Sequence, residues 1–184
     1  MLDLQPTLTG ALLTLRPLKA EDWPALFAAA CDPLIWAVHP EPDRYREEVF
    51  RRFFDGALAS GGGLAAVENA TARIVGSSRF HHYTESGEGE IDIGYSFLVR
   101  RLWGGNYNRE MKGLMLGHAL QSVGRARFVV GVDNHRSRRA MEKIGGVETG
   151  PGVDAAGNPC VVFVITRASF GAGPLAPFVR GAGR

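Results

Sequence analysis

The segment 91–116 constrains this chain more than any other, because a strand, a glycine turn and a helix follow one another directly there. Residues 91–99 are rich in Ile, Tyr, Phe and Val with small or polar residues between them, which predicts a strand. After the Gly-Gly-Asn turn at 104–106, apolar residues recur at helical spacing over 107–120. A helix N-terminus behind such a turn presents free backbone N–H groups. The segment therefore predicts a site for phosphate or pyrophosphate.

Two common phosphate motifs are absent from the sequence. No G-x-G-x-x-G follows an early strand, which argues against a dinucleotide-binding fold. No G-x-x-x-x-G-K-[ST] is present either, which argues against a P-loop. A plain tight turn is the alternative to an anion site, and a glycine turn alone does not decide between the two.

Three segments together point to one family. Residues 101–106, R-L-W-G-G-N, resemble the R/Q-x-x-G-x-G/A pyrophosphate loop of the GNAT superfamily of acyl-CoA N-acyltransferases. Residues 133–146 resemble its second signature, N-x-x-S followed by E-K-x-G, and residues 13–22 look like its first strand and helix. The matches fall in family order and the resemblance covers about residues 10–167. It is closest to the branch that includes the ribosomal-protein N-terminal acetyltransferases.

The fold that both the patterns and the resemblance imply is α+β (α/β-like). It is a single GNAT-type mixed, mostly antiparallel sheet of six to seven strands with helices on both faces. Strands are expected at 11–18, 64–68, 73–83, 91–99, 126–132, 147–150 and 160–166, and helices at 19–31, 43–60, 107–120 and 134–144. Residues 34–42 are expected to be a loop. The acetyltransferase-like domain is expected over 1–167, followed by a mobile Gly/Ala/Pro-rich tail over 168–184, in which Leu175 and Phe178 could dock on the body.

Composition limits the class of protein. A chain of 184 residues with 45% hydrophobic and 22% charged residues is long enough for one domain with a sizeable core. The net charge of +2 gives no reason to expect a nucleic-acid partner. Cys31 and Cys160 are too few for a metal site or a disulfide framework. With no apolar run of membrane length and no signal peptide, we expect a cytoplasmic protein without a membrane partner, either a monomer or a homodimer.

The resemblance implies acetyl-CoA as cosubstrate. A backbone N–H near Leu98 or Val99 would polarise the thioester carbonyl, and Arg101 would reach a phosphate. Asn106 departs from the family pattern, which usually has Gly or Ala there; asparagine tolerates left-handed backbone angles and could also cap the helix. The residues expected to bind the cosubstrate are Leu98, Val99, Arg101, Gly104, Gly105, Asn106, Tyr107, Asn134 and Ser137. For Asn134, simple helix capping is the alternative role.

Transfer to an amine needs a base, because an alkylammonium with a pKa near ~10 has no free lone pair at neutral pH. Asp92 and Glu90 are the carboxylates of the central strand, on the same face. By resemblance, Asp92 stands where this branch often has Glu. A structural acid that bonds to a neighbouring strand is the alternative for Asp92.

Three histidines are rival candidates for the base or for acceptor contacts. His81 and His82 are consecutive in a strand, so one is expected on each side of it. His39 lies in a segment with Trp36 that could line the acceptor pocket. The expected substrate-binding residues are Trp36, His39, His81 and His82; ordinary packing or surface roles are the alternatives.

A proton donor for the leaving thiolate is harder to find. Many GNAT enzymes have a Tyr seven residues after the Asn of the second signature, and here that residue is Met141. Ser137 or water would then supply the proton, or no acid is needed. The expected catalytic residues are Asp92, Glu90 and Ser137.

The sequence thus predicts an acetyl-CoA-dependent N-acetyltransferase that acts on a primary amine by direct attack in a ternary complex. The amine would be a protein N-terminus or a small molecule. The alternative is a non-catalytic acyl-CoA-binding sensor or interaction module. No metal is expected, and the identity of the acceptor stays open.

Overall fold

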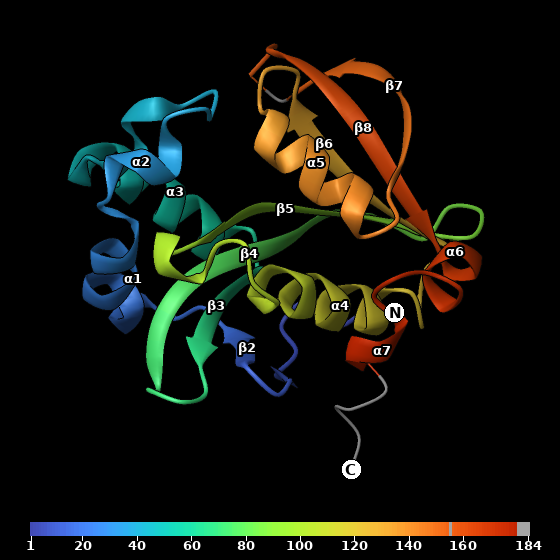
Figure 1. Ribbon diagram of the computed structural model, residues 1–184, viewed down its shortest axis with the longest axis horizontal. Helices are drawn as coiled ribbons and strands as arrows, with labels where there is room; N and C mark the ends of the chain where they lie inside the picture. The colour runs from blue at the N-terminus through green and yellow to red at the C-terminus, as the bar shows by residue number, and fades with distance from the viewer. Residues whose placement is uncertain (155, 180–184) are drawn as a thin grey trace.

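Eight strands form one sheet within residues 1–154 and 156–179, the residues that this computed structural model of the protein describes (Figure 1). Its order is β1-β2-β3-β4-β5-β6-β8-β7, and only the neighbours β5 and β6 are parallel. The strands are β1 (Leu8–Thr9), β2 (Leu13–Pro17), β3 (Gly63–Glu68), β4 (Arg73–Thr84), β5 (Glu90–Leu98), β6 (Arg125–Gly131), β7 (Val147–Val153) and β8 (Pro159–Thr166). The expected α+β class is confirmed. The count exceeds six to seven because a two-residue strand, β1, pairs with β2.

The helices are α1 (Trp23–Ala30), α2 (Pro33–Trp36), α3 (Glu47–Ala59), α4 (Tyr107–Ala119), α5 (His135–Lys143), α6 (Arg167–Gly171) and α7 (Ala176–Val179). Helix α2 lies where a loop was expected. Its start has a simple cause, because the Asp32 carboxylate accepts from the Leu34 N–H and Pro33 occupies the first helical position. The expected helix 43–60 begins later, at Glu47, because residues 42–45 form a 3₁₀ turn.

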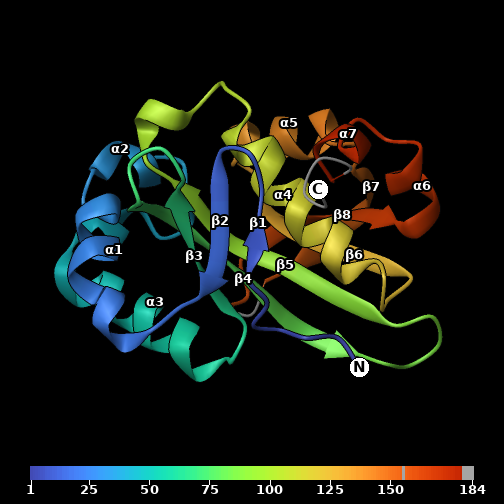
Figure 2. The same cartoon turned by 90° about the horizontal axis from the view of Figure 1, so that it is seen from below.

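Two apolar clusters cover opposite faces of the sheet. Figure 2 shows α1 and α3 on one side of strands β2 to β4 and α4 on the other. The larger cluster joins the buried face of α4 to strands on both sides of the β5–β6 junction, through residues such as Met111, Met115, Ile93 and Phe128. The smaller cluster packs α1, α2 and α3 against the opposite face of the sheet. The central strands therefore lie between two packed layers.

The sheet divides where β5 meets β6. Only Glu90, Ile91 and Asp92 of β5 pair with β6, and the last pair is Asp92 with Arg127. Beyond that pair the two strands diverge, so the sheet opens into two arms (Figure 1). The rest of β5 remains paired with β4 on its other edge.

The expected tail is partly built into the fold. Residues 168–179 include most of α6 and all of α7, and Leu175 is fully buried in the larger cluster. The docking of Leu175 is the alternative that the sequence left open for this segment, since burial of one leucine stabilises such a contact. The side chain of Phe178 lies outside the described part. Residues 180–184 lie outside the described part. No helix of that part is long and apolar enough to cross a membrane.

Candidate active site

The gap between β5 and β6 presents backbone groups of β5 that no strand covers. The Val99 N–H donates to the Val75 carbonyl, 2.9 Å away, so it is already used. In an antiparallel ladder the N–H groups alternate in direction, so the Leu98 N–H points away from β4 and toward the gap. The Leu98 carbonyl points the same way and accepts from the Trp103 indole at 2.8 Å. Of the two expected backbone donors, Leu98 is the one with the right direction.

The glycine turn after β5 leads into α4 as expected. Gly104 takes the left-handed conformation with φ +77°, and a side chain there would project into open space. Asn106 has an ordinary right-handed φ of −85° and its side chain makes no cap to α4. Its tolerance of left-handed angles is therefore not needed, because Gly104 supplies that conformation. The turn leaves the first N–H groups of a thirteen-residue helix without side-chain caps, as an anion site requires.

Arg101 does not point to a free phosphate site. Its two Nη atoms lie 2.8 and 2.7 Å from the carboxylate oxygens of Glu68, and the Tyr107 hydroxyl donates to the same carboxylate at 3.1 Å. The bonds from Arg101, followed by one from the Thr71 hydroxyl at 2.6 Å and that from Tyr107, lower the pKa of Glu68 to about 2. Arg101 and Tyr107 thus tie the turn to the end of β3. The sequence could not show this, because Glu68 is more than thirty residues away.

A cavity of about 470 Å³ lies beside the start of the turn. Its walls come from α1, from the α1–α2 connection and from the residues just after β5, and the ion pair between Arg100 and Asp32 lies on it. Across the gap, the Arg136 guanidinium of α5 stacks on the Trp103 ring at 3.9 Å and donates to the Ile35 carbonyl at 3.1 Å. The two arms are therefore in contact at the mouth of the gap.

The second signature forms the start of α5. The Asn134 side chain caps the helix, because its Oδ1 accepts from the Ser137 N–H at 3.1 Å. That is the capping role that was the alternative for Asn134. Met141, at the position of the family tyrosine, is buried in the larger cluster. Among the described residues, no side chain of α5 offers a tyrosine-like acid.

Two β-bulges reshape the central pair of strands. On β4 the register to β5 shifts between His81 and Thr84, and His82 takes a left-handed φ of +50°. On β5 it shifts between Gly94 and Phe97, and Tyr95 takes φ +52°. A bulge interrupts the alternation of side chains. His81 and His82 consequently lie on the same side, with ring centroids 4.6 Å apart, and the expectation of one histidine on each side was wrong.

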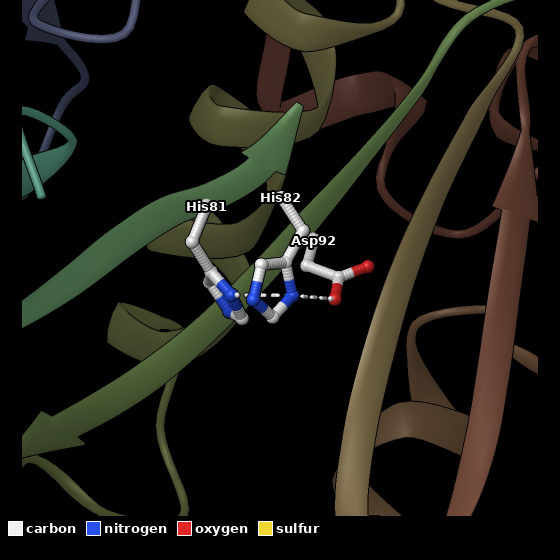
Figure 3. Close-up of side chains that lie close together, drawn as sticks. All are labelled: His81, His82 and Asp92. Atoms are coloured by element: carbon white, nitrogen blue, oxygen red, sulfur yellow. Dashed lines mark hydrogen bonds and ion pairs between the residues drawn. The ribbon is translucent and has the colours of Figure 1, made fainter. Parts of the chain in front are cut away.

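The bulge brings His82 against Asp92 (Figure 3). His82 Nδ1 lies 2.9 Å from Asp92 Oδ2 and 3.3 Å from His81 Nδ1. Asp92 is only 2% exposed, whereas the His82 side chain is 69% exposed. Burial, followed by the charges of His82 and Arg79, lowers the pKa of His81 to about 4. Asp92 is thus the covered partner, and His82 is the group that reaches solvent.

Glu90 belongs to a neighbouring ion-pair network. Arg127 Nη1 lies 2.8 Å from Glu90 Oε1, and Arg127 Nε lies 3.3 Å from Asp92 Oδ1. Arg125 adds a longer contact of 3.5 Å to Glu90. Glu90 is therefore neutralised by two arginines, which makes it a poor candidate for a base.

The same cluster offers donor atoms of the kind that bind metals. One atom each from His81, His82 and Asp92 lies within 4.8 Å of the others, and such a set suits zinc. However, Arg79, Lys112 and Arg127 all contribute positive charge near His81. Those charges oppose a dication, so we interpret the cluster as a hydrogen-bonded histidine–aspartate pair.

Trp36 and His39 lie apart from this cluster. Trp36 is buried in the smaller apolar cluster and donates its indole N–H to the Ala30 carbonyl. His39 Nε2 lies 3.1 Å from Arg44 Nη1, and burial together with that positive charge lowers the pKa of His39 to about 3. Both residues shape the α2 region, and Trp36 has no surface left to offer a substrate.

Lys112 of α4 is a polar residue of the gap that the sequence interpretation missed. It is 3% exposed, and its Nζ lies 2.5 Å from the Ser96 hydroxyl of β5. A signal was present, because Lys112 is four residues before Leu116 and thus on the widened apolar face of the helix. Tyr95, whose ring lies 5.1 Å from that of His81, was missed because bulges have no clear sequence pattern.

Comparison with known proteins gives a consistent result. Residues 13–147 match the family described as acetyltransferase (GNAT) domain. A GCN5-related N-acetyltransferase from Brucella melitensis superposes with a TM-score of 0.80 at 19% identity, over 91% of this chain and 81% of that one. RimJ of Mycobacterium smegmatis, solved in complex with CoA-disulfide, superposes with a TM-score of 0.69 at 21% identity, over 94% and 90%. At such identities the structures show the fold alone. No curated protein matches the sequence.

Proposed function

This chain belongs to the GNAT acetyltransferase domain family, whose cosubstrate is acetyl-CoA, and we propose that it transfers the acetyl group to a primary amine by direct attack. The observation that supports the proposal is that three features of the site lie in succession along β5. The glycine turn, the exposed edge of the strand and the His82–Asp92 pair follow one another on the gap between the two arms. A cosubstrate bound by its pyrophosphate at the turn would extend along that edge toward the pair.

The position of the thioester follows from distance along the strand. Asp92 and Leu98 are six residues apart, which is about 20 Å in a strand. A thioester at Leu98 would therefore be out of reach of the His82–Asp92 pair. The bulge at Tyr95 and Ser96 is nearer, since the Tyr95 ring contacts that of His81. We place the thioester at this bulge and assign the Leu98 N–H to the pantetheine arm.

His82 is the proposed general base. A carboxylate only accepts hydrogen bonds, so Asp92 holds the proton of His82 on Nδ1 and leaves the lone pair on Nε2. The exposed ring would take a proton from the incoming ammonium or amine, directly or through one water. Asp92, expected to act as the base itself, would then be the residue that orients His82. The proton for the CoA thiolate would come from water, because Met141 is buried and apolar.

The proposal is tested first by binding and then by turnover. Thermal unfolding is measured with and without acetyl-CoA; at ~100 times Kd, binding adds about 2.7 kcal/mol. For a domain of this size that corresponds to roughly 5–10 °C. Release of free thiol is then followed with peptides of varied N-terminus, aminoglycosides, polyamines and small metabolic amines. No thermal shift at millimolar acetyl-CoA would exclude the proposal.

The second candidate is an acyl-CoA sensor without turnover. It is favoured by the missing tyrosine at Met141 and by the commitment of Arg101 to Glu68. A sensor would show the same thermal shift, and no amine of the panel would accelerate thiol release. If an amine accelerates thiol release, and if that rate falls when His82 is substituted, the protein is an enzyme and not a sensor.

A further inference from the structure

Lys112 has an unusual position for a lysine. It projects from α4 into the place where β5 and β6 separate, and it touches both strands. Its Nζ lies 2.5 Å from Ser96 Oγ on β5 and 5.3 Å from the centre of the Phe128 ring on β6. Ser96 Oγ lies 2.7 Å from Ser78 Oγ, so the serine pair holds the lysine from one side. Phe128 is the first residue of β6 beyond the last pair with β5.

Apart from the Phe128 ring, whose centre lies 5.3 Å from Nζ, the surroundings of Lys112 do little to stabilise a charge. Among the described residues, no carboxylate forms an ion pair with Lys112, and its one hydrogen-bond partner is the Ser96 hydroxyl. Burial lowers the pKa of Lys112 to about 7. Near neutral pH about half of the molecules then carry a free amine, compared with roughly one in a few thousand for a lysine in water. A neutral amine is the nucleophilic form.

Lys112 and the His82–Asp92 pair reach the bulge of β5 from opposite faces. Tyr95 and His81 lie on the face covered by α3, where the Tyr95 ring contacts Phe53. Lys112 lies on the face covered by α4. A planar thioester carbonyl held at the bulge therefore has an amine available on the side away from the external acceptor.

We propose that Lys112 is a self-acetylation site, which takes the acetyl group from acetyl-CoA bound in the gap. The inference rests on the proposed function, since it requires acetyl-CoA with its thioester at the bulge. The free Nζ attacks the thioester carbon, the new C–N bond forms and the C–S bond breaks. The nitrogen loses one proton, the CoA thiolate gains one, and the products are an N-acetyl-lysine and free CoA.

Acetylation of Lys112 would change the site. The amide cannot become charged, and the added acetyl group would project between Ser96 and Phe128, the two residues that the amine now contacts. That is the space in which the thioester of the next cosubstrate would lie. The modified protein is therefore expected to bind acetyl-CoA more weakly, so self-acetylation would inhibit the enzyme.

The chain offers a direct test, because it contains only three lysines, and Lys19 and Lys143 are both exposed. The purified protein is incubated with trideuteroacetyl-CoA, which distinguishes new acetyl groups from those already present. Peptide mass spectrometry then gives the occupancy of each lysine over time. We expect label on Lys112 at a rate independent of protein concentration and at least about tenfold above that of either exposed lysine. Equal or greater labelling of Lys19 and Lys143 would overturn the inference.

Thermal unfolding on the same samples distinguishes failure of self-acetylation from failure of acetyl-CoA binding. A shift with acetyl-CoA and no label on Lys112 refutes self-acetylation and leaves the proposed function intact. No shift and no label means that acetyl-CoA is not bound, and both fail. The variant Gly105→Glu, designed to block the turn, is expected to abolish the label on Lys112. Persistence of the label in a folded Gly105→Glu protein that no longer shows the thermal shift with acetyl-CoA would show reaction from solution and would also overturn the inference.

Discussion

His82 Nδ1 lies 2.9 Å from Asp92 Oδ2 across the two central strands, and this contact exists because His82 occupies a β-bulge with φ +50°. In a regular strand His82 would face the opposite side of the sheet from His81. The bulge turns it toward Asp92 and leaves most of its ring in solvent. A backbone irregularity thus creates the pair that we assign to proton transfer.

Replacing His82 tests that assignment. His82→Gln is expected to lower kcat by about 10²–10³-fold with little change in acetyl-CoA affinity, because general-base catalysis contributes on that order. The measurement is thiol release with the amine found in the panel, together with the thermal shift. His81→Gln is the matched control, since His81 is half-buried and its lowered pKa keeps it neutral. A larger loss in His81→Gln than in His82→Gln would refute the assignment.

Asp92→Asn should act through His82. The asparagine side chain has about the same volume as aspartate, but its amide can no longer hold the proton on His82 Nδ1. We therefore expect kcat to fall at least tenfold. In the His82→Gln background the same change should have little further effect on kcat, because the two residues work as one unit. Independent, multiplicative losses in the double variant would show that Asp92 acts alone.

A carboxylate in the turn should repel the cosubstrate. Gly105 has no positive φ, and the nearest atom to a side chain there is 4.0 Å away, so Gly105→Glu is tolerated by the fold. Its negative charge would face the phosphates at the helix N-terminus. We expect the thermal shift with acetyl-CoA to disappear in Gly105→Glu and to persist in Gly105→Ala. If both variants bind acetyl-CoA equally well, the turn does not form the binding site for its phosphates.

Glu68 should matter for stability. Its carboxylate is paired with Arg101, which is half exposed and stays solvated when its partner is removed, so Glu68→Ala is expected to cost about 1 kcal/mol of unfolding free energy. The pKa of Glu68 falls from 4.5 to about 2 in the folded state. Its contribution is therefore complete above pH 4.5 and is lost as the pH falls toward 2. Denaturant unfolding from pH 6 down to the lowest pH that remains reversible should show a smaller decline in the variant than in the wild type.

Lys112 should make the free energy of unfolding depend on pH between neutral and alkaline conditions. Its pKa falls from 10.5 in the unfolded chain to about 7 in the folded protein. Between these values the unfolded chain binds more protons, so the free energy of unfolding rises with pH over that window. Lys112→Met should be more stable than the wild type at pH 7, with the difference shrinking toward pH 10. A constant difference across the window would mean that Lys112 stays charged when folded.

The sequence predicted the parts of the site that depend on neighbouring residues. The strand, the glycine turn and the start of α4 are where local pattern placed them, whereas the cap at Asn134 was only the alternative to its expected role in binding the cosubstrate. What failed depends on distant partners. Arg101 is held by Glu68, and the orientation of His82 depends on a bulge that its own residues do not announce. Sequence periodicity describes regular strands, whereas this site is built where the strands are irregular.

Helix α4 carries a second role that follows from the shortness of the β5–β6 ladder. With three residue pairs joining the arms, the packing of α4 against both of them is a second link across the junction. A molecule wedged between the arms would strain that packing as well as the ladder. Hydrogen–deuterium exchange of the α4 amides should therefore report on this strain. The exchange should slow when a ligand fits between the arms and stabilises their packing on α4, and it should become faster when a ligand forces the arms apart.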